Sequence, residues 1–107
     1  MQQFMFSFSG FSVPEPMLEG VRRGEISSFC LFRRKNFESV QQLRNLTLSL
    51  HQAAEAGGHP PPMIGIDQEG GQLMAMTTGT TGLPGNMALG ATRSTELAHS
   101  AGGVLAR

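Results

Sequence analysis

Hydrophobic residues follow two different spacings along this chain. Three short runs are apolar almost without interruption, and between them apolar residues recur every three or four positions. The first pattern predicts strands and the second predicts helices. The predicted strands are residues 4–8, 28–32 and 63–66. Because the run at 28–32 does not alternate with polar residues, we expect it to be buried on both faces.

The longest periodic segment has clear helix signals at both ends. Ser39 is placed to cap its first turn, and Gln42 three residues later completes a capping-box pattern. Gly57 and Gly58 follow the last apolar position and predict the end of the helix. The apolar side of this helix is formed by Val40, Leu43, Leu46, Leu50 and Ala53.

Two shorter helices are predicted on either side of these segments. Pro14 and Pro16 introduce the first, and Gly24 is placed to end it in a left-handed conformation. Ser94 is placed to cap the last helix, which we expect to run to Arg107 without a stop signal. The first helix presents Met17, Leu18 and Val21 on one side, and the last presents Leu97, Ala101, Val104 and Leu105.

The order of these elements predicts the fold class. Strands alternate with helices over short connections, which is typical of an α/β fold with a parallel sheet and helices outside it. Three apolar strands would leave two long unpaired edges, which finished proteins avoid. Together with the helix still running at Arg107, this indicates the opening piece of a larger domain.

Composition and charge exclude several classes of function. Eight basic residues balance eight acidic ones, so we expect no recruitment of nucleic acid or of an anionic membrane. The one basic cluster, Arg33-Arg34-Lys35, is interpreted as a solvated strand end rather than a polyanion site. Cys30 is the single cysteine, so no internal disulfide can form, and no run approaches the ~20 apolar residues of a membrane span. Without a signal-peptide pattern, we expect a cytoplasmic protein.

The segment MIGIDQEGGQ (63–72) ends a predicted strand in two acids and two glycines. If the strand continues, Asp67 and Glu69 project from the same face, about 6.5–7 Å apart. Carboxylates at the carboxyl end of a strand are well placed to accept hydrogen bonds from sugar hydroxyls, and Gly70 and Gly71 would let the backbone turn sharply. The alternative is that the acids merely cap amides within the turn. Spacing alone leaves both interpretations open.

Other chemistries find no support in the sequence. The glycines at 70–71 match neither the phosphate loop nor the dinucleotide fingerprint, and no Gly-x-Ser-x-Gly elbow occurs. The three histidines, His51, His59 and His99, have no partners at metal-ligand spacing. The sequence therefore predicts neither a metal site nor a cofactor.

Three segments, taken in order, resemble one known family. They are SFCLFRRKNFESVQQLRNLT, PPMIGIDQEGGQL and LPGNMALGAT. They resemble the N-terminal domain of glycoside hydrolase family 3, above all its bacterial β-N-acetylglucosaminidase (β-hexosaminidase) branch, which trims N-acetylglucosamine from peptidoglycan fragments. The resemblance covers Phe4 to Arg107. It implies that residues 1–107 hold roughly the first three β/α units of a TIM (β/α)₈ barrel and that the remainder of the barrel is required.

The resemblance also implies roles for individual residues. Asp67 corresponds to the family's aspartate that hydrogen-bonds hydroxyls of the sugar in the −1 subsite. Glu69, Gly70 and Gly71 would shape the turn that aims it. The family's nucleophilic aspartate and its proton donor, a histidine paired with an aspartate in the aminosugar branch, are expected beyond Arg107. No catalytic residue is therefore assigned within the chain.

The chain departs from the family pattern at two positions. The family usually has an arginine at the position of Gln72, and the aminosugar branch has another at the position of Ala75. The second arginine normally helps to grip the sugar, a contact that Ala75 does not supply.

The implied activity is retaining hydrolysis of terminal β-linked N-acetylglucosamine, with a carbohydrate as partner and no cofactor. Two other readings stay open from the sequence. One is a truncated, non-catalytic product, and the other is an unrelated α/β module that binds a small polar ligand.

Overall fold

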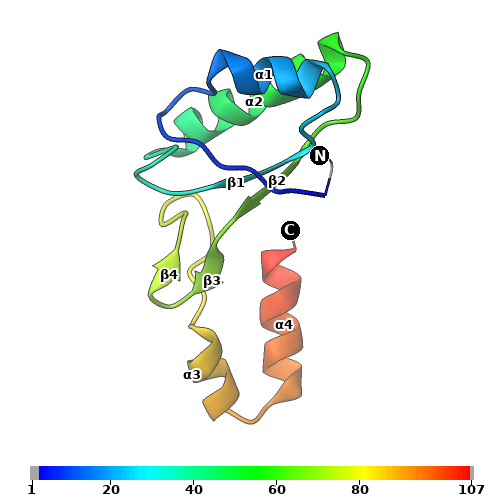
Figure 1. Cartoon of the computed structure of the whole chain (residues 1–107). Helices are drawn as coiled ribbons and strands as arrows, with labels where there is room; N and C mark the ends of the chain where they lie inside the picture. Colours follow the sequence, from blue (N-terminus) through cyan, green and yellow to red (C-terminus); the bar gives the residue numbers. More distant parts are fainter. Residues whose placement is uncertain (1–2, 107) are drawn as a thin grey trace. The chain divides into compact units, whose positions relative to one another are not determined.

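The computed structural model describes residues 3–106, which form two compact units (Figure 1). The first unit ends at Ile66 and the second begins at Asp67. Parallel strands covered by helices make up the first, whereas a small hairpin and two helices make up the second. The predicted sugar-binding residue is therefore the first residue of the second unit.

Two parallel strands form the centre of the first unit. β1 (Ser28–Leu31) and β2 (Met63–Ile66) pair in register, from Ser28 opposite Met63 to Leu31 opposite Ile66. Both strands consequently end at the same edge of the sheet. Their direction confirms the predicted parallel sheet of an α/β fold.

The two faces of β1 differ in burial. Phe29 and Leu31 are both 0% exposed, whereas Ser28 and Cys30 are only half-buried. The expectation that both faces of this strand are buried is wrong. The reason is that α1 and α2 both lie on one side of the strands (Figure 1).

The predicted first strand, residues 4–8, pairs with β1 only at Phe6. The amide of Phe6 donates to Ser28 at 3.0 Å, and its carbonyl oxygen accepts from Cys30 at 2.8 Å. On either side of Phe6, hydrogen bonds from side chains take the place of backbone pairing between strands. Ser28 Oγ donates to the carbonyl oxygen of Phe4, and Asn36 Nδ2 donates to that of Phe8, each at 2.9 Å. The segment is thus held as a third parallel chain without continuous strand pairing.

The helices of the first unit pack against each other over the sheet. They are α1 (Glu15–Arg22) and α2 (Val40–Ala56). Their ends approach so closely that a methyl group on Gly57 would overlap the carbonyl oxygen of Arg22. Between helices and strands lies an apolar core, in which the rings of Phe8 and Phe29 meet edge to face at 6.2 Å. The other large, fully buried side chains of this core are Val21, Leu31, Phe37 and Leu50.

The start of α2 follows the sequence with one difference. Ser39 Oγ accepts from the amide of Gln42 at 3.2 Å, which confirms the predicted cap. The Gln42 side chain reaches the amide of Glu38 at 2.9 Å rather than that of Ser39. The capping box is therefore displaced by one residue.

Both helices of the first unit end in left-handed glycines. Gly24 has φ 68° and follows α1, and Gly58 has φ 71° and follows α2. In each case the next residue bonds back into the helix, Glu25 to Gly20 and His59 to Ala54, at 2.9 Å. This is the pattern of a Schellman motif. It confirms the helix ends predicted from these glycines.

The second unit contains four short elements. β3 (Gln68–Gly70) and β4 (Leu73–Met74) form an antiparallel hairpin, followed by α3 (Asn86–Ala91) and α4 (Thr95–Leu105). Ser94 caps α4 by accepting from the amide of Leu97, as predicted. The helix extends to Leu105, and the amide of Ala106 bonds back to Gly102. That it runs on to Arg107 stays a prediction. Arg107 itself lies outside the described residues.

The helices of the second unit bury little of their apolar surface. α3 and α4 contact each other, yet neither contains a buried residue. Met87 is 90% exposed, and Leu97 and Leu105 are each 51% exposed. Between residues 3 and 106, no helix is both long enough and apolar enough to cross a membrane.

Candidate functional site

The acidic segment forms a tight hairpin directly after β2. The carbonyl oxygen of Asp67 accepts from the amide of Ala75 at 3.0 Å, which closes the hairpin at its base. Gln68 lies opposite Met74, and the register shifts between Gln68 and Gly70. The parallel strand therefore does not continue through Glu69, because the chain reverses at the glycines and pairs with itself.

Gly70 and Gly71 form the turn of this hairpin, and both have left-handed backbone conformations, with φ 86° and 60°. A Cβ atom on Gly70 would lie 2.6 Å from the carbonyl oxygen of Pro84, and one on Gly71 would lie 2.9 Å from Gly85. The amide of Gly71 also donates to Leu83 at 2.8 Å. Glycine is thus required here both for its backbone freedom and for the close approach of the segment that leads into α3.

Gln68 holds the strand that returns from this turn, a role that the sequence did not reveal. Its Oε1 accepts from the amide of Met76 at 2.8 Å, and its Nε2 donates to the Met76 carbonyl oxygen at 2.9 Å. The hydroxyl of Thr80 donates to the same carbonyl oxygen at 3.0 Å. The side-chain amide of Gln68 therefore acts like one more residue of a strand and continues the hairpin past Met74.

The two carboxylates of the hairpin are open to solvent. Asp67 and Glu69 are both exposed, while Gln68 between them is half-buried, as alternation along an extended chain requires. Within residues 3–106 neither carboxylate takes part in a hydrogen bond or an ion pair. The alternative that these acids cap amides of the turn is therefore wrong. Both remain available as acceptors for a ligand.

The two positions that depart from the family pattern lie on the returning side of the hairpin. Gln72 is exposed at the end of the turn, whereas Ala75 is 8% exposed. The structure thus places Asp67 and Ala75 side by side through their backbone bond. At this place Ala75 offers a ligand no polar side-chain group.

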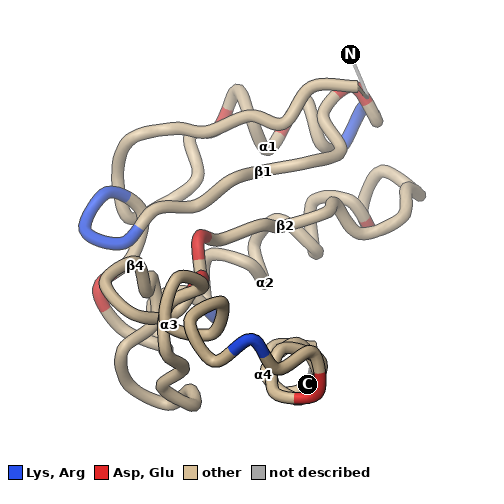
Figure 2. Tube along the Cα trace, turned by 90° about the horizontal axis from the view of Figure 1, so that it is seen from below, with Lys and Arg blue, Asp and Glu red and all other residues tan. Residues whose placement is uncertain are grey.

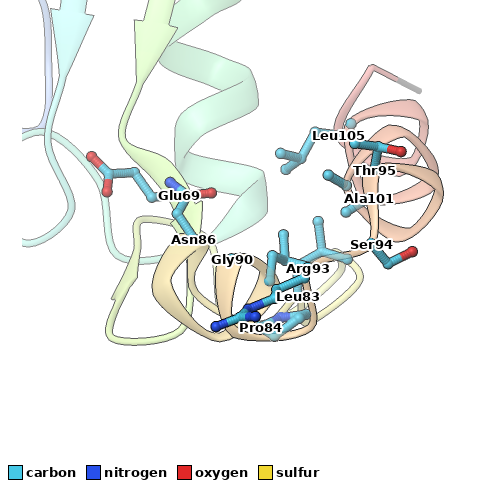
Figure 3. A pocket seen from close by; sticks show the side chains of 13 residues that line it. Glu69, Leu83, Pro84, Asn86, Gly90, Arg93, Ser94, Thr95, Ala101 and Leu105 are labelled. Carbon is cyan, nitrogen blue, oxygen red and sulfur yellow. The ribbon is translucent and has the colours of Figure 1, made fainter.

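A cleft of about 490 Å³ lies in the second unit beside α3 and α4 (Figure 3). Leu89, Ala101 and Leu105 give it an apolar wall, and Asn86, Arg93, Ser94 and Thr95 contribute polar groups. Glu69 belongs to its lining, but Figure 3 shows its carboxylate turned away from the hollow. Asp67 is not among the lining residues. The cleft is therefore distinct from the surface that the Asp67 carboxylate presents.

Across residues 3–106, no three histidine, cysteine, aspartate or glutamate side chains come together in a way that could hold an ion. The chemistry at the hairpin is accordingly that of exposed carboxylates on a short backbone scaffold.

Comparison with known proteins identifies the family to which the chain belongs. The sequence profile of the Glycosyl hydrolase family 3 N terminal domain matches residues 10–107. The chain belongs to this family. Among the similar proteins, the Beta-hexosaminidase of Nitrosomonas eutropha is 34% identical over 108 residues. That of Neisseria gonorrhoeae is 31% identical over 97 residues.

Solved family 3 structures confirm the predicted fold class. The β-N-acetylglucosaminidase of Paenibacillus sp. str. FPU-7 superimposes with a TM-score of 0.80 at 33% identity, over 94% of this chain and 19% of that one. NagZ of Neisseria gonorrhoeae in complex with N-trifluoroacetyl-D-glucosamine gives a TM-score of 0.68 at 27% identity, over 94% and 28%. The described elements are therefore the first β/α units of a family 3 TIM barrel.

The chain covers only part of the length of these relatives. It aligns over 95% of its own length with the Nitrosomonas protein and over 30% of that protein's length. For the Neisseria gonorrhoeae protein the two shares are 91% and 26%.

Proposed function

We propose that the complete protein to which this chain belongs is a retaining β-glycosidase that removes terminal β-linked N-acetylglucosamine. In this proposal Asp67 binds hydroxyls of that sugar. The observation that carries it is the exposed, unpartnered carboxylate of Asp67, fixed directly after β2 in a chain 34% identical to a Beta-hexosaminidase. The sugar follows from the names of the relatives, one of which is solved with an N-acylated glucosamine.

Physical chemistry supports a binding role for Asp67. An ionised carboxylate accepts two hydroxyl hydrogen bonds at once, and hydrogen bonds to charged groups contribute about 1.5–3 kcal/mol each. Because the carbonyl oxygen of Asp67 accepts a hydrogen bond from the amide of Ala75, the backbone that carries the Asp67 side chain is held in place. Turnover by the retaining route requires a nucleophile and a separate proton donor, and we assign both to the remainder of the barrel.

The exposed apolar side chains of α3 and α4 also support the proposal that this chain is one part of a larger barrel. Met87, Leu97 and Leu105 are each at least half exposed in the second unit. Large apolar side chains of this kind are normally buried in a finished domain. We propose that the remainder of the barrel covers them. The cytoplasmic location predicted from the sequence stays a prediction.

The test is turnover by the complete protein before and after Asp67→Ala. The wild-type protein should release 4-nitrophenol from 4-nitrophenyl N-acetyl-β-D-glucosaminide, with retention at the anomeric carbon seen by proton NMR. Loss of two charge-assisted hydrogen bonds should lower kcat/KM by about 100-fold or more. The thermal midpoint should not change, because the carboxylate has no partner within residues 3–106.

Glu55→Ala on the exposed side of α2 is the matched control, since it also removes an acid and should leave kcat/KM unchanged. A wild-type protein without activity on this substrate would refute the proposed activity. A folded Asp67→Ala variant with normal kcat/KM would refute the role of Asp67.

A further inference from the structure

Three hydrogen bonds converge on the main chain of Met76, where the hairpin returns. Gln68 Oε1 accepts from the Met76 amide at 2.8 Å, and Gln68 Nε2 donates to the Met76 carbonyl oxygen at 2.9 Å. The hydroxyl of Thr80 donates to the same carbonyl oxygen at 3.0 Å and accepts from Gln68 Nε2 at 3.4 Å. We define Gln68, Met76 and Thr80 as the Gln68 network. Each of its members is bonded to both of the others.

The network fixes one threonine of a loop that is otherwise free. A side-chain amide offers two donors and two acceptor positions, and Gln68 uses both donors and one acceptor position within the network. Four threonines lie close together in the loop that follows Met76. Within residues 3–106, the hydroxyl groups of Thr77, Thr78 and Thr81 have no hydrogen-bond partner, whereas that of Thr80 is bonded twice. The order of this loop therefore depends on Thr80.

The network lies directly beside the backbone of Asp67. The carbonyl oxygen of Asp67 accepts from the amide of Ala75, and the next residue on each side, Gln68 and Met76, is bonded through the network. Figure 2 shows the tube turning red where β2 ends, which is the position of Asp67. The Asp67 carboxylate is exposed and has no partner of its own within residues 3–106. Its direction consequently depends on how firmly the backbone beneath it is held.

We propose that Gln68 and Thr80 are positioning residues for Asp67. This inference rests on the proposed function, in which Asp67 binds hydroxyls of the sugar. A carboxylate on a loosely held backbone occupies its binding position for only part of the time, and the apparent affinity for the ligand falls by that fraction. The network raises the fraction before the sugar arrives, so less of the binding energy is used to order the hairpin.

The network acts through geometry and not through charge. Its three side chains carry no ionisable group, and the sequence has no charged residue between Glu69 and Arg93. Substitutions in it should therefore leave the pH dependence of kcat/KM unchanged in shape. They should change the concentration of sugar that is needed to occupy the site.

The test compares Gln68→Ala and Thr80→Val in the complete protein, with 4-nitrophenyl N-acetyl-β-D-glucosaminide as substrate. Thr81→Val is the matched control, because it removes the neighbouring hydroxyl, which has no partner within residues 3–106. Gln68→Ala should raise KM by about threefold or more, and Thr80→Val should raise it less. The kcat value should stay within about twofold of wild type, since saturating sugar selects the bound position of Asp67. Thr81→Val should change neither value.

A double-mutant cycle separates positioning from a general effect on the fold. In a protein that already carries Asp67→Ala, Gln68→Ala should not lower kcat/KM further, because the residue through which it acts is gone. An equal loss with and without Asp67 would overturn the inference. So would an unchanged KM in Gln68→Ala, or an equal rise in Thr81→Val. If Gln68→Ala does not fold, Thr80→Val takes its place in the cycle, because it keeps both bonds between Gln68 and Met76.

Failure of the proposed function would be recognised separately. A wild-type protein that neither hydrolyses the substrate nor binds N-acetylglucosamine in calorimetry would refute that function. NMR order parameters of the Asp67 Cβ–H bonds, measured without sugar, then decide on the positioning role. They should fall in Gln68→Ala and in Thr80→Val and stay unchanged in Thr81→Val. Equal order parameters in all four proteins would overturn the inference.

Discussion

Asn36 donates a hydrogen bond from Nδ2 to the carbonyl oxygen of Phe8 at 2.9 Å, although the two residues are 28 positions apart. Its Oδ1 accepts from the amide of Phe32, also at 2.9 Å. The buried side-chain amide of Asn36 thereby links the segment around Phe8 to the end of β1. Within residues 3–106, these two parts of the chain do not pair with each other through backbone hydrogen bonds. Together with the backbone bonds of Phe6, the Asn36 amide holds the N-terminal segment against β1.

Asn36→Ala should lower the free energy of unfolding by about 1–3 kcal/mol, because buried polar groups of Phe8 and Phe32 lose their partner. Urea denaturation measures the change. The control is Asn45→Ala on the exposed side of α2, where the side chain bonds to Gln41 and to no other residue between 3 and 106. Asn45→Ala should cost less than about 0.5 kcal/mol. Equal effects of the two substitutions would show that Asn36 has no special part in stability.

Alanine substitutions at three glycines allow the effect of backbone strain on stability to be distinguished from the effect of steric overlap. Gly82→Ala should change stability little, since nothing lies within 4 Å of the added Cβ and φ is ordinary. Gly58→Ala forces a side chain to φ 71° in open space and should cost about 1–2 kcal/mol. Gly70→Ala adds overlap with Pro84 to the strain, so its cost should exceed that of Gly58→Ala. Urea midpoints in any other order would contradict this account.

Gln68→Ala should loosen the returning strand of the hairpin, because both bonds to Met76 are lost. Hydrogen exchange of the Met76 amide should accelerate by about tenfold or more, the equivalent of one ordinary hydrogen bond. Gln68→Glu keeps the acceptor for that amide and should have a smaller effect. Gln72→Ala, at the exposed turn, is the control and should leave the exchange rate unchanged. Slow exchange in Gln68→Ala would show that other bonds hold the strand.

Arg23 donates to the carboxylate of Glu25 at 2.9 and 3.0 Å, and this hydrogen bonding holds the pKa of Glu25 below its ordinary value of 4.5. A lowered pKa in the folded state means that the pair stabilises the fold above pH 4.5 and that this contribution is lost as the pH falls through the folded pKa. Arg23→Gln should raise the pKa of Glu25 toward 4.5, measured by NMR titration of its carboxyl carbon. Arg44→Gln, an exposed arginine of α2, should not move it.

Elements with a strong local signal could be predicted from the sequence. α2 has regular apolar spacing, a serine before it and glycines after it, and each of these features determines the structure locally. The fold class followed from the order of such elements, and the family comparison confirms it.

Features that depend on contacts between distant residues were missed. Asn36 follows three charged residues, and no local pattern marks it as buried, because its burial depends on Phe8, which is 28 positions away. α3 has six residues, no side-chain cap and no buried position, so it carries no periodic signal. At the candidate site, the left-handed turn could be expected from paired glycines. The bonds from Gln68 to Met76 could not, because nothing in the sequence marks the chain reversal at that length.

The parallel pairing of β1 and β2 has a consequence for how the chain acquires its structure. Ser28 can pair with Met63 only after the residues between them have been synthesised. The sheet therefore requires closure of a loop of more than thirty residues. Loops of this length slow folding, whereas hairpins close within about 1–10 μs. During synthesis the β3–β4 hairpin can therefore form almost as soon as Ala75 is available. The sheet that precedes it in sequence must wait for a slower, non-local search.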